Sequence, residues 1–280
     1  MVVSTPTSAP NAAAAIAALT VLLPHSVKLV EGAPQAWLIS ATPEVLARDL
    51  ALLVEPLGAG ELRVRIASTA TFDAVGREIW RLTVAVRDRP GLLASTAAVA
   101  SQHRLSIVSA RCASWSARDA HGEALALQQV EVVSGDLNLS GEPDWPWIGQ
   151  DLRAALTGGQ APITRFLPSG PAAVTITPEG TPEGFDGCLW RVRVDAPDTF
   201  GLLAALCRWL TSAGANIEAA VVGLRSEATG NSSTASTATI STATISTATI
   251  STATDELVVA AGPGFDSRAA ELAAELSRPG

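Results

Sequence analysis

Two short motifs, 110 positions apart, carry the residues best suited to chemistry in this chain. Residues 88–93 read DRPGLL and residues 198–203 read DTFGLL. Gly91 and Gly201 each follow an alternating apolar and polar stretch and precede apolar residues at helical spacing, so each glycine stands where a strand becomes a helix. Because glycine lacks a Cβ and a helix N-terminus presents free N–H groups, such a corner can hold an anion or a carboxylate.

Asp88 and Asp198 admit two interpretations. A carboxylate that caps the helix from the preceding turn would explain both residues without any ligand. Alternatively, the two loops frame an amino-acid pocket between two modules. In that pocket the helix N-terminus faces the ligand carboxylate, and a residue of the next strand, such as Asn216, binds the polar end of the ligand.

Within each copy we pair the motif glycine with the residue that begins the next strand. Gly201 then shares a half-site with Asn216, and Gly91 shares one with Ser106. The two half-sites are therefore not expected to be equivalent. The candidate ligand-binding residues are Asp88, Arg89, Gly91, Leu92, Leu93, Ser106, Ile107, Asp198, Gly201, Leu202, Leu203, Asn216 and Ile217.

The sequence lacks motifs for catalysis or metal binding. His25, His103 and His121 share no local spacing with one another or with a carboxylate or cysteine pair, as a metal site would require. Neither a G-x-x-x-x-G-K-[ST] phosphate loop nor a G-x-S-x-G nucleophile turn occurs. We therefore expect no catalytic residue, no metal site, no cofactor and no enzymatic activity.

The elements that position the two glycines belong to a duplicated unit. Residues 79–112 align without a gap on residues 189–222, as expected for an internal repeat. Alternation over residues 80–86 predicts a strand, and Pro90 suits the first position of a helix that continues from Gly91, with Asp88 or Arg89 just outside it. A strand follows each helix.

Each unit also begins with an extra leading strand. Residues 61–66 alternate in polarity, and at the same offset of 110 they align with residues 171–176. Either each leading strand pairs antiparallel with the strand after its own linker, or the two leading strands are exchanged between the units. We favour the first arrangement because consecutive strands are usually neighbours.

The order of elements resembles that of the ACT domain, a small ligand-binding regulatory module. It consists of a strand, then D-x-x-G-L-L opening a helix, then Asn216-Ile217 on the next strand. The tandem arrangement resembles the C-terminal ACT pair of bacterial protein-PII uridylyltransferases, in which a segment like residues 39–53 also precedes the pair. The second copy departs from the common form of the motif, since DTFGLL lacks the Arg-Pro of DRPGLL. The nucleotidyltransferase and HD motifs of the uridylyltransferases are absent.

This resemblance implies an α+β fold of two ferredoxin-like modules of the βαββαβ type, each preceded here by its leading strand. It also implies a non-catalytic regulator that senses nitrogen or amino acids, with glutamine as the ligand. A homodimer or a regulated partner protein remains open. The alternative is an assembly module whose exposed sheet edges pair with another protein and which takes no small ligand.

The expected domain organisation follows from these units. Thr42-Pro43 opens a helix ahead of the repeat, while the three STATI repeats and the STAT that follows them offer no consistently apolar face and predict an inserted loop. Asp144 and Asp266 are predicted helix caps. We expect a disordered or loosely structured N-terminus (1–33), a lead-in helical segment (34–60), a first ACT-like domain (61–157), a linker (158–170) and a second ACT-like domain (171–280) with the insert at 231–254.

Composition narrows the partners further. The chain has 280 residues and a net charge of -8, so it lacks the basic face that nucleic-acid binding requires. Its three cysteines show no C-x-x-C spacing, which indicates a reducing, cytoplasmic setting. Residues 12–23 are apolar, but no basic residue precedes them, and no stretch resembles a membrane span. We expect no nucleic-acid and no membrane partner.

Overall fold

A computed structural model describes residues 11–278 of the chain, with gaps at 40, 59, 74–75, 116–123, 136–141, 159–169, 182–186, 198, 200 and 227–250. The predicted linker therefore lies largely outside the described residues, as does most of the predicted insert.

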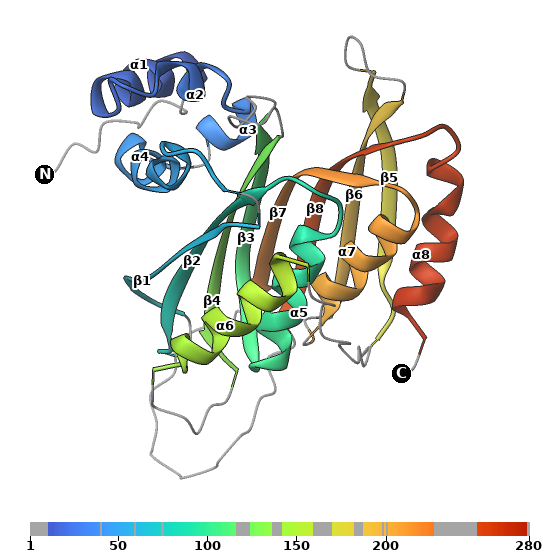
Figure 1. Ribbon diagram of the computed structural model, residues 1–280. Helices are drawn as coiled ribbons and strands as arrows, with labels where there is room; N and C mark the ends of the chain where they lie inside the picture. The colour runs from blue at the N-terminus through green and yellow to red at the C-terminus, as the bar shows by residue number, and fades with distance from the viewer. Residues whose placement is uncertain are drawn as a thin grey trace, which may run out of the picture.

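Two repeated units build one eight-stranded antiparallel sheet (Figure 1). The strand order is β1-β2-β4-β3-β7-β8-β6-β5, so each unit supplies one half. The first unit comprises β1 (Leu62–Phe72), β2 (Glu78–Arg87), α5 (Leu92–Gln102), β3 (Leu105–Trp115), β4 (Leu125–Ser134) and α6 (Trp145–Leu156). The second comprises β5 (Ala173–Gly180), β6 (Cys188–Pro197), α7 (Leu202–Ser212), β7 (Asn216–Ser226), β8 (Ser251–Ala261), η2 (Asp266–Arg268) and α8 (Ala269–Leu276).

Each leading strand pairs within its own unit. Val64 of β1 lies opposite Val84 of β2, and Val174 of β5 lies opposite Val194 of β6. The leading strand thus occupies the sheet edge beside the first strand of the unit, which is where a βαββαβ module carries its last strand. The fold is α+β, with two ferredoxin-like modules that each begin with this extra strand. The predicted pairing is confirmed, and the exchanged arrangement is wrong.

The central pair β3 and β7 joins the two halves. Arg111 lies opposite Val221, and Ala113 lies opposite Ala219, in antiparallel register. Helices α5 and α7 contact each other beneath this junction and cover the same face of the sheet (Figure 1). A single apolar core therefore runs through both modules.

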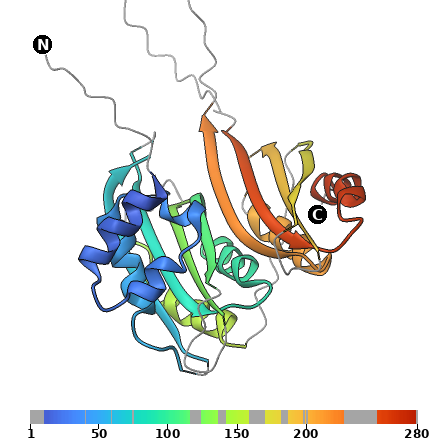
Figure 2. The same ribbon diagram turned by 90° about the horizontal axis from the view of Figure 1, so that it is seen from above.

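The N-terminal segment is a helical layer on the opposite face of the sheet, over the first module only (Figure 2). It contains α1 (Ala12–Leu22), α2 (Val27–Glu31), α3 (Gln35–Leu38), α4 (Pro43–Leu50) and η1 (Ala51–Leu53). Leu19 and Leu46 are fully buried in a second core with Trp115, whose indole N–H donates to Leu29 O at 3.0 Å. The expectation of a disordered or loosely structured N-terminus is therefore wrong for residues 11–33, while residues 1–10 lie outside the described part of the chain.

The sequence of each sheet face explains why only the first module carries this layer. Ala85 pairs with Leu127 beneath the helices, and both side chains are buried. The matching pair in the second module is Asp195 and Thr254, and the Thr254 hydroxyl donates to Asp195 Oδ1 at 2.8 Å. Arg193 Nε also donates to Asp195 Oδ2 at 2.9 Å. This polar face is satisfied without an apolar cover.

Local details at the helix termini correct two predictions and confirm one. Both motif helices begin one residue after the glycine, at Leu92 and Leu202, so Pro90 lies in the preceding turn rather than at the first helical position. The Asp144 carboxylate caps α6 as predicted, accepting from Trp147 N–H at 3.2 Å. Asp266 does not cap the closing helix.

The residue Asp266 begins the 3-10 turn η2 instead, and Arg268 is the N-cap of α8. The buried Phe265 packs 6.0 Å from the Trp209 ring and holds the chain in this turn before the helix starts. The Arg268 guanidinium lies 5.5 Å from the Trp209 ring centroid, within the range of a cation–π contact.

The last STAT of the repeat tract belongs to a strand rather than to the predicted insert. Residues 251–254 open β8, where Thr254 lies opposite Asp195 on one side and Gly223 on the other. A strand with two neighbours satisfies its N–H and C=O groups in both ladders. The predicted insert boundary of 231–254 is therefore four residues too long, and residues 231–250 lie outside the described residues.

Candidate functional site

The two motif glycines hold the same backbone conformation at equivalent corners. Gly91 has φ 84° and Gly201 has φ 88°, in the left-handed region that favours glycine. A Cβ built on Gly91 would lie 3.6 Å from Thr211 Cγ2, an ordinary contact. Conformation, and not space, therefore requires glycine there. The carbonyls of Gly91 and Gly201 accept from Ser95 N–H at 3.0 Å and from Ala205 N–H at 2.8 Å, so the positive end of each helix begins at its glycine.

Each corner opens into a cleft between the two modules. We name the first the Asn216 cleft: it contains Gly91 and Leu93 from the first module and Asn216 and Ile217 from the second. It has about 320 Å³ of space, part of it open to solvent.

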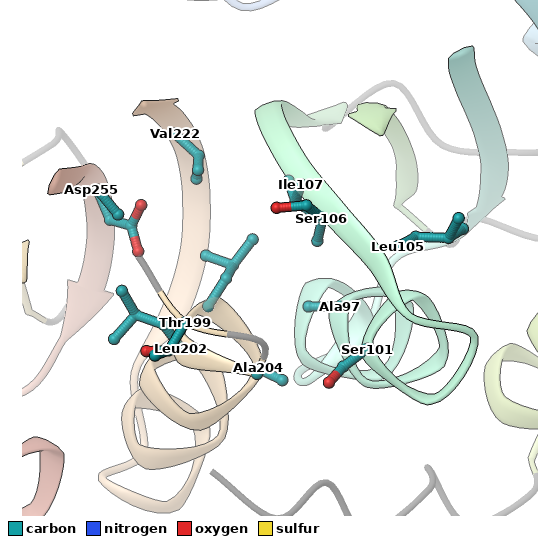
Figure 3. Close-up of a pocket in the computed structure, with 13 residues that line it drawn as sticks. Ala97, Ser101, Leu105, Ser106, Ile107, Thr199, Leu202, Ala204, Val222 and Asp255 are labelled. Atoms are coloured by element: carbon teal, nitrogen blue, oxygen red, sulfur yellow. The ribbon is translucent and has the colours of Figure 1, made fainter. Parts of the chain in front are cut away.

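The second cleft, named the Ser106 cleft, has the reverse composition (Figure 3). Thr199 and Leu202 come from the second module, whereas Ser106 and Ile107 come from the first. It has about 400 Å³ of space, again partly open, and lies between the starts of β3 and α7 with α5 alongside (Figure 3). The two clefts are related by the approximate twofold symmetry of the repeat.

Each cleft therefore combines the glycine corner of one module with the strand start of the other. The prediction that each half-site lies within one module is wrong. Gly91 shares a cleft with Asn216, and Gly201 shares a cleft with Ser106. The antiparallel β3–β7 pairing is the cause, since Ala113 lies opposite Ala219 and the start of β7 thus reaches the end of β3. Each strand start is thereby carried to the glycine corner of the other module.

Twelve of the thirteen candidate residues line the two clefts. The exception is Asp198, which lies outside the described residues. The candidate residues of the first motif, with Asn216 and Ile217, line the Asn216 cleft. The described candidate residues of the second motif, with Ser106 and Ile107, line the Ser106 cleft.

Asp88 lines a cleft and is not a helix cap. Its own N–H donates to Ala124 O at 2.8 Å, while the Ser114 hydroxyl and the Arg89 N–H donate to its carboxylate. No side chain caps α5. Burial raises the pKa of Asp88 above its usual value, and the two hydrogen bonds oppose this only in part.

The polar residues that sequence reasoning missed are Gln128 and Asp255. Gln128 lines the Asn216 cleft, is 2% exposed, and accepts from the Thr96 hydroxyl at 2.7 Å. Asp255 lines the Ser106 cleft and is 1% exposed. Both positions pair with the corresponding valine of the neighbouring strand, Val84 and Val194, so they are structural equivalents. The signal was present in the sequence, because each is the one strongly polar residue on an otherwise apolar strand face.

The equivalence means that the two clefts differ in charge at the same place. The Gln128 amide lines the Asn216 cleft, and the Asp255 carboxylate lines the Ser106 cleft at the equivalent position. Nearby, burial raises the pKa of the Cys207 thiol well above its usual value, with the Cys112 thiol and the Asp255 carboxylate adding to the effect. Cys207 is thus an unreactive core residue.

The remaining titratable groups bear on metal binding and on contacts between helices. Within the described residues, His, Cys, Asp and Glu side chains form no group of three or more that could hold a metal ion. His103 Nε2 lies 2.8 Å from Asp151 Oδ2 and links α5 to α6. Among the described helices, none is long and apolar enough to cross a membrane.

Comparison with known proteins adds little to this geometry. No protein-family model matches the chain, and no curated protein matches it. A crystal structure of an unknown protein from Galdieria sulphuraria is 17% identical with a TM-score of 0.25, over 71% of this chain and 90% of that one. A crystal structure of aspartate kinase from Synechocystis is 13% identical with a TM-score of 0.33, over 71% of this chain and 26% of that one. Both scores are below 0.5, so the fold assignment rests on the strand order and pairing described above.

Proposed function

We propose that this chain is a non-catalytic regulatory protein of the cytoplasm that binds a small amino acid in the Asn216 and Ser106 clefts. The observation that supports the proposal is the crossed composition of the clefts, in which a glycine corner of one module faces the strand start of the other. A ligand in either cleft would contact both modules. Its binding energy would then depend on how the modules pack, as regulation requires.

The residues of each cleft suit the two ends of an amino acid. The first-turn N–H groups after Gly91 or Gly201 favour the ligand carboxylate. Carboxylates that line the clefts, Asp88 in one and Asp255 in the other, favour its ammonium group. Glutamine is the first ligand to test, because the ACT pair of the uridylyltransferases, which the sequence resembles, implies it.

A heat-denaturation panel of the common amino acids tests this proposal. An amino acid present at about 100 times its dissociation constant should stabilise the protein by roughly 2.7 kcal/mol. Asn216→Ala and Ser106→Ala form a matched pair, since each removes the polar residue at the strand start of one cleft. Calorimetric titration should find two ligands per parent chain and one per chain in each variant. A panel in which no amino acid shifts the melting curve at millimolar concentration would reject the proposal.

A second candidate is an assembly module that pairs through a sheet edge, in a homodimer or with a regulated partner protein. The exposed edge strand β5 favours it: β5 has one strand neighbour, and Ala173, Thr175 and Thr177 are exposed. Such an edge is a template for strand addition. Sedimentation velocity over a range of concentrations should then show a dimer, and a monomer at every concentration would count against self-association.

A further inference from the structure

A second cavity adjoins the Asn216 cleft, where β2 ends, β1 begins and α6 finishes. It has about 680 Å³ of open space, and its wall includes Arg87, Asp88, Arg89 and Glu61. Asp88 and Arg89 line both this cavity and the Asn216 cleft. The two spaces therefore share a wall at the first motif.

Backbone carbonyls anchor the two guanidinium groups at this wall. Arg89 Nη2 donates to Ala155 O at 3.2 Å, which is its one side-chain hydrogen bond within the described residues. Arg87 Nη2 donates to Leu57 O at 3.4 Å. A guanidinium carries five N–H donors, so Arg89 retains donors for a bound anion.

The two acids of the wall already have partners within the protein. Glu61 Oε1 accepts from Arg63 Nε at 2.9 Å, and Glu61 Oε2 accepts from Gly58 N–H at 2.6 Å. The Asp88 carboxylate accepts from the Ser114 hydroxyl and the Arg89 N–H. Arg63 offsets the charge of Glu61, so this wall carries two guanidinium groups, Arg87 and Arg89, against the one remaining carboxylate of Asp88.

The second module has no counterpart to this cationic wall. Pro197 stands 110 positions after Arg87, and Thr199 stands 110 positions after Arg89. The Ser106 cleft instead contains the buried Asp255 carboxylate. An anionic group is thus favoured beside one cleft and opposed in the other.

We infer that the Asn216 cleft and the arginine-lined cavity form one elongated site for a dicarboxylic amino acid. The glycine corner holds the α-carboxylate, and the guanidinium groups of Arg87 and Arg89 hold the side-chain carboxylate. The Ser106 cleft takes a neutral amino acid, because Asp255 repels a second carboxylate. This inference rests on the proposed function, since it assigns the ligand class of the same clefts.

Titration calorimetry with L-glutamate and L-glutamine on the full chain tests the inference. Arg89→Gln is the test variant, because Arg89 is exposed and glutamine keeps side-chain N–H donors in place of the one that Arg89 gives to Ala155 O. Arg153→Gln is the matched control: it removes the same charge from an exposed position on α6 that does not line the cavity. Arg89→Gln should weaken glutamate binding by about tenfold or more, as expected for a lost charge-assisted contact, and should leave glutamine binding unchanged within about twofold. Arg153→Gln should change neither.

Several outcomes would overturn the inference, and they are separable from failure of the proposed function. A parent protein that binds glutamine but not glutamate contradicts the inference and leaves amino-acid binding intact. If Arg89→Gln weakens the binding of both ligands equally, Arg89 does not bind the side-chain carboxylate. The same holds if Arg89→Gln and Arg153→Gln weaken glutamate binding equally. If neither ligand binds, both the inference and the glutamine assignment fail.

Discussion

Asp88 shows how a residue can match a capping pattern and yet serve another purpose. It lies three positions before the helix glycine, as a capping carboxylate would, but α5 has no side-chain cap, and Asp88 faces Ser114 and the cleft. Burial raises the pKa of this carboxyl group above its usual value. The ionised form is therefore less stable in the folded protein than in the unfolded chain.

The pH dependence of stability follows from this shift. Because the folded pKa of Asp88 is raised, its favourable contribution is present at pH values below the unfolded pKa of about 3.9 and is lost as pH rises through the folded pKa. Asp88→Asn keeps an oxygen that accepts from Ser114 and Arg89 but cannot ionise. Urea unfolding at a series of pH values from 4 to 7 should show the variant gaining stability relative to the parent as pH rises. If the difference in unfolding free energy between variant and parent stays constant or shrinks as pH rises, ionisation of Asp88 does not destabilise the folded protein.

At the scale of elements, the N-terminal helices act as structural cover for the first module. The opposite sheet face of that module presents Trp115, Leu125 and Leu127, whose exposure to water would be costly. Helix α1 supplies Leu19 to this core, although the helix is apolar on nearly every side. Burial against this sheet face thus accounts for the apolar residues that α1 places on it.

Two substitutions in the same helix measure this packing. Leu19→Ala removes a fully buried side chain and should lower the free energy of unfolding by about 2–5 kcal/mol. Val21→Ala changes a side chain that is 79% exposed and should change stability by less than about 0.5 kcal/mol. Chemical denaturation of both variants gives the comparison. If Leu19→Ala unfolds at the same denaturant concentration as Val21→Ala, α1 does not pack on the sheet.

For the molecule as a whole, the β3–β7 ladder and the α5–α7 contact make the two modules one structural body. Ala110 and Val222 lie opposite each other in the central strands, and both are buried in the shared core. Neither module can unfold without exposing part of this core. The Asn216 and Ser106 clefts both contain residues of the two modules, so they depend on the same β3–β7 junction. Ligand binding and the packing of the modules are therefore linked.

Cooperative unfolding is the consequence that calorimetry can check. Scanning calorimetry should show one transition whose calorimetric and van't Hoff enthalpies agree. A saturating amino-acid ligand should move that whole transition to higher temperature, because each cleft includes residues of both modules. Two resolved transitions, of which a ligand moves only one, would show that the modules unfold independently.

Local sequence patterns determined which helices and strands each module contains. The 110-residue offset predicted the duplication, the alternation around Val64 and Val174 predicted the leading strands, and the glycines predicted the strand-to-helix corners. These features depend on backbone preferences and on the periodic burial of neighbouring residues, which the local sequence records directly.

Only the tertiary structure decided which residues meet across the modules. The antiparallel β3–β7 register brings Asn216 to Gly91 and Ser106 to Gly201, and no local pattern states which two sheet edges will pair. Likewise, the burial of Leu19 depends on the apolar sheet face that it covers, which lies far away in the sequence. Pairing and burial between distant segments depend on the complementarity of whole surfaces, so they emerge only when the chain is folded.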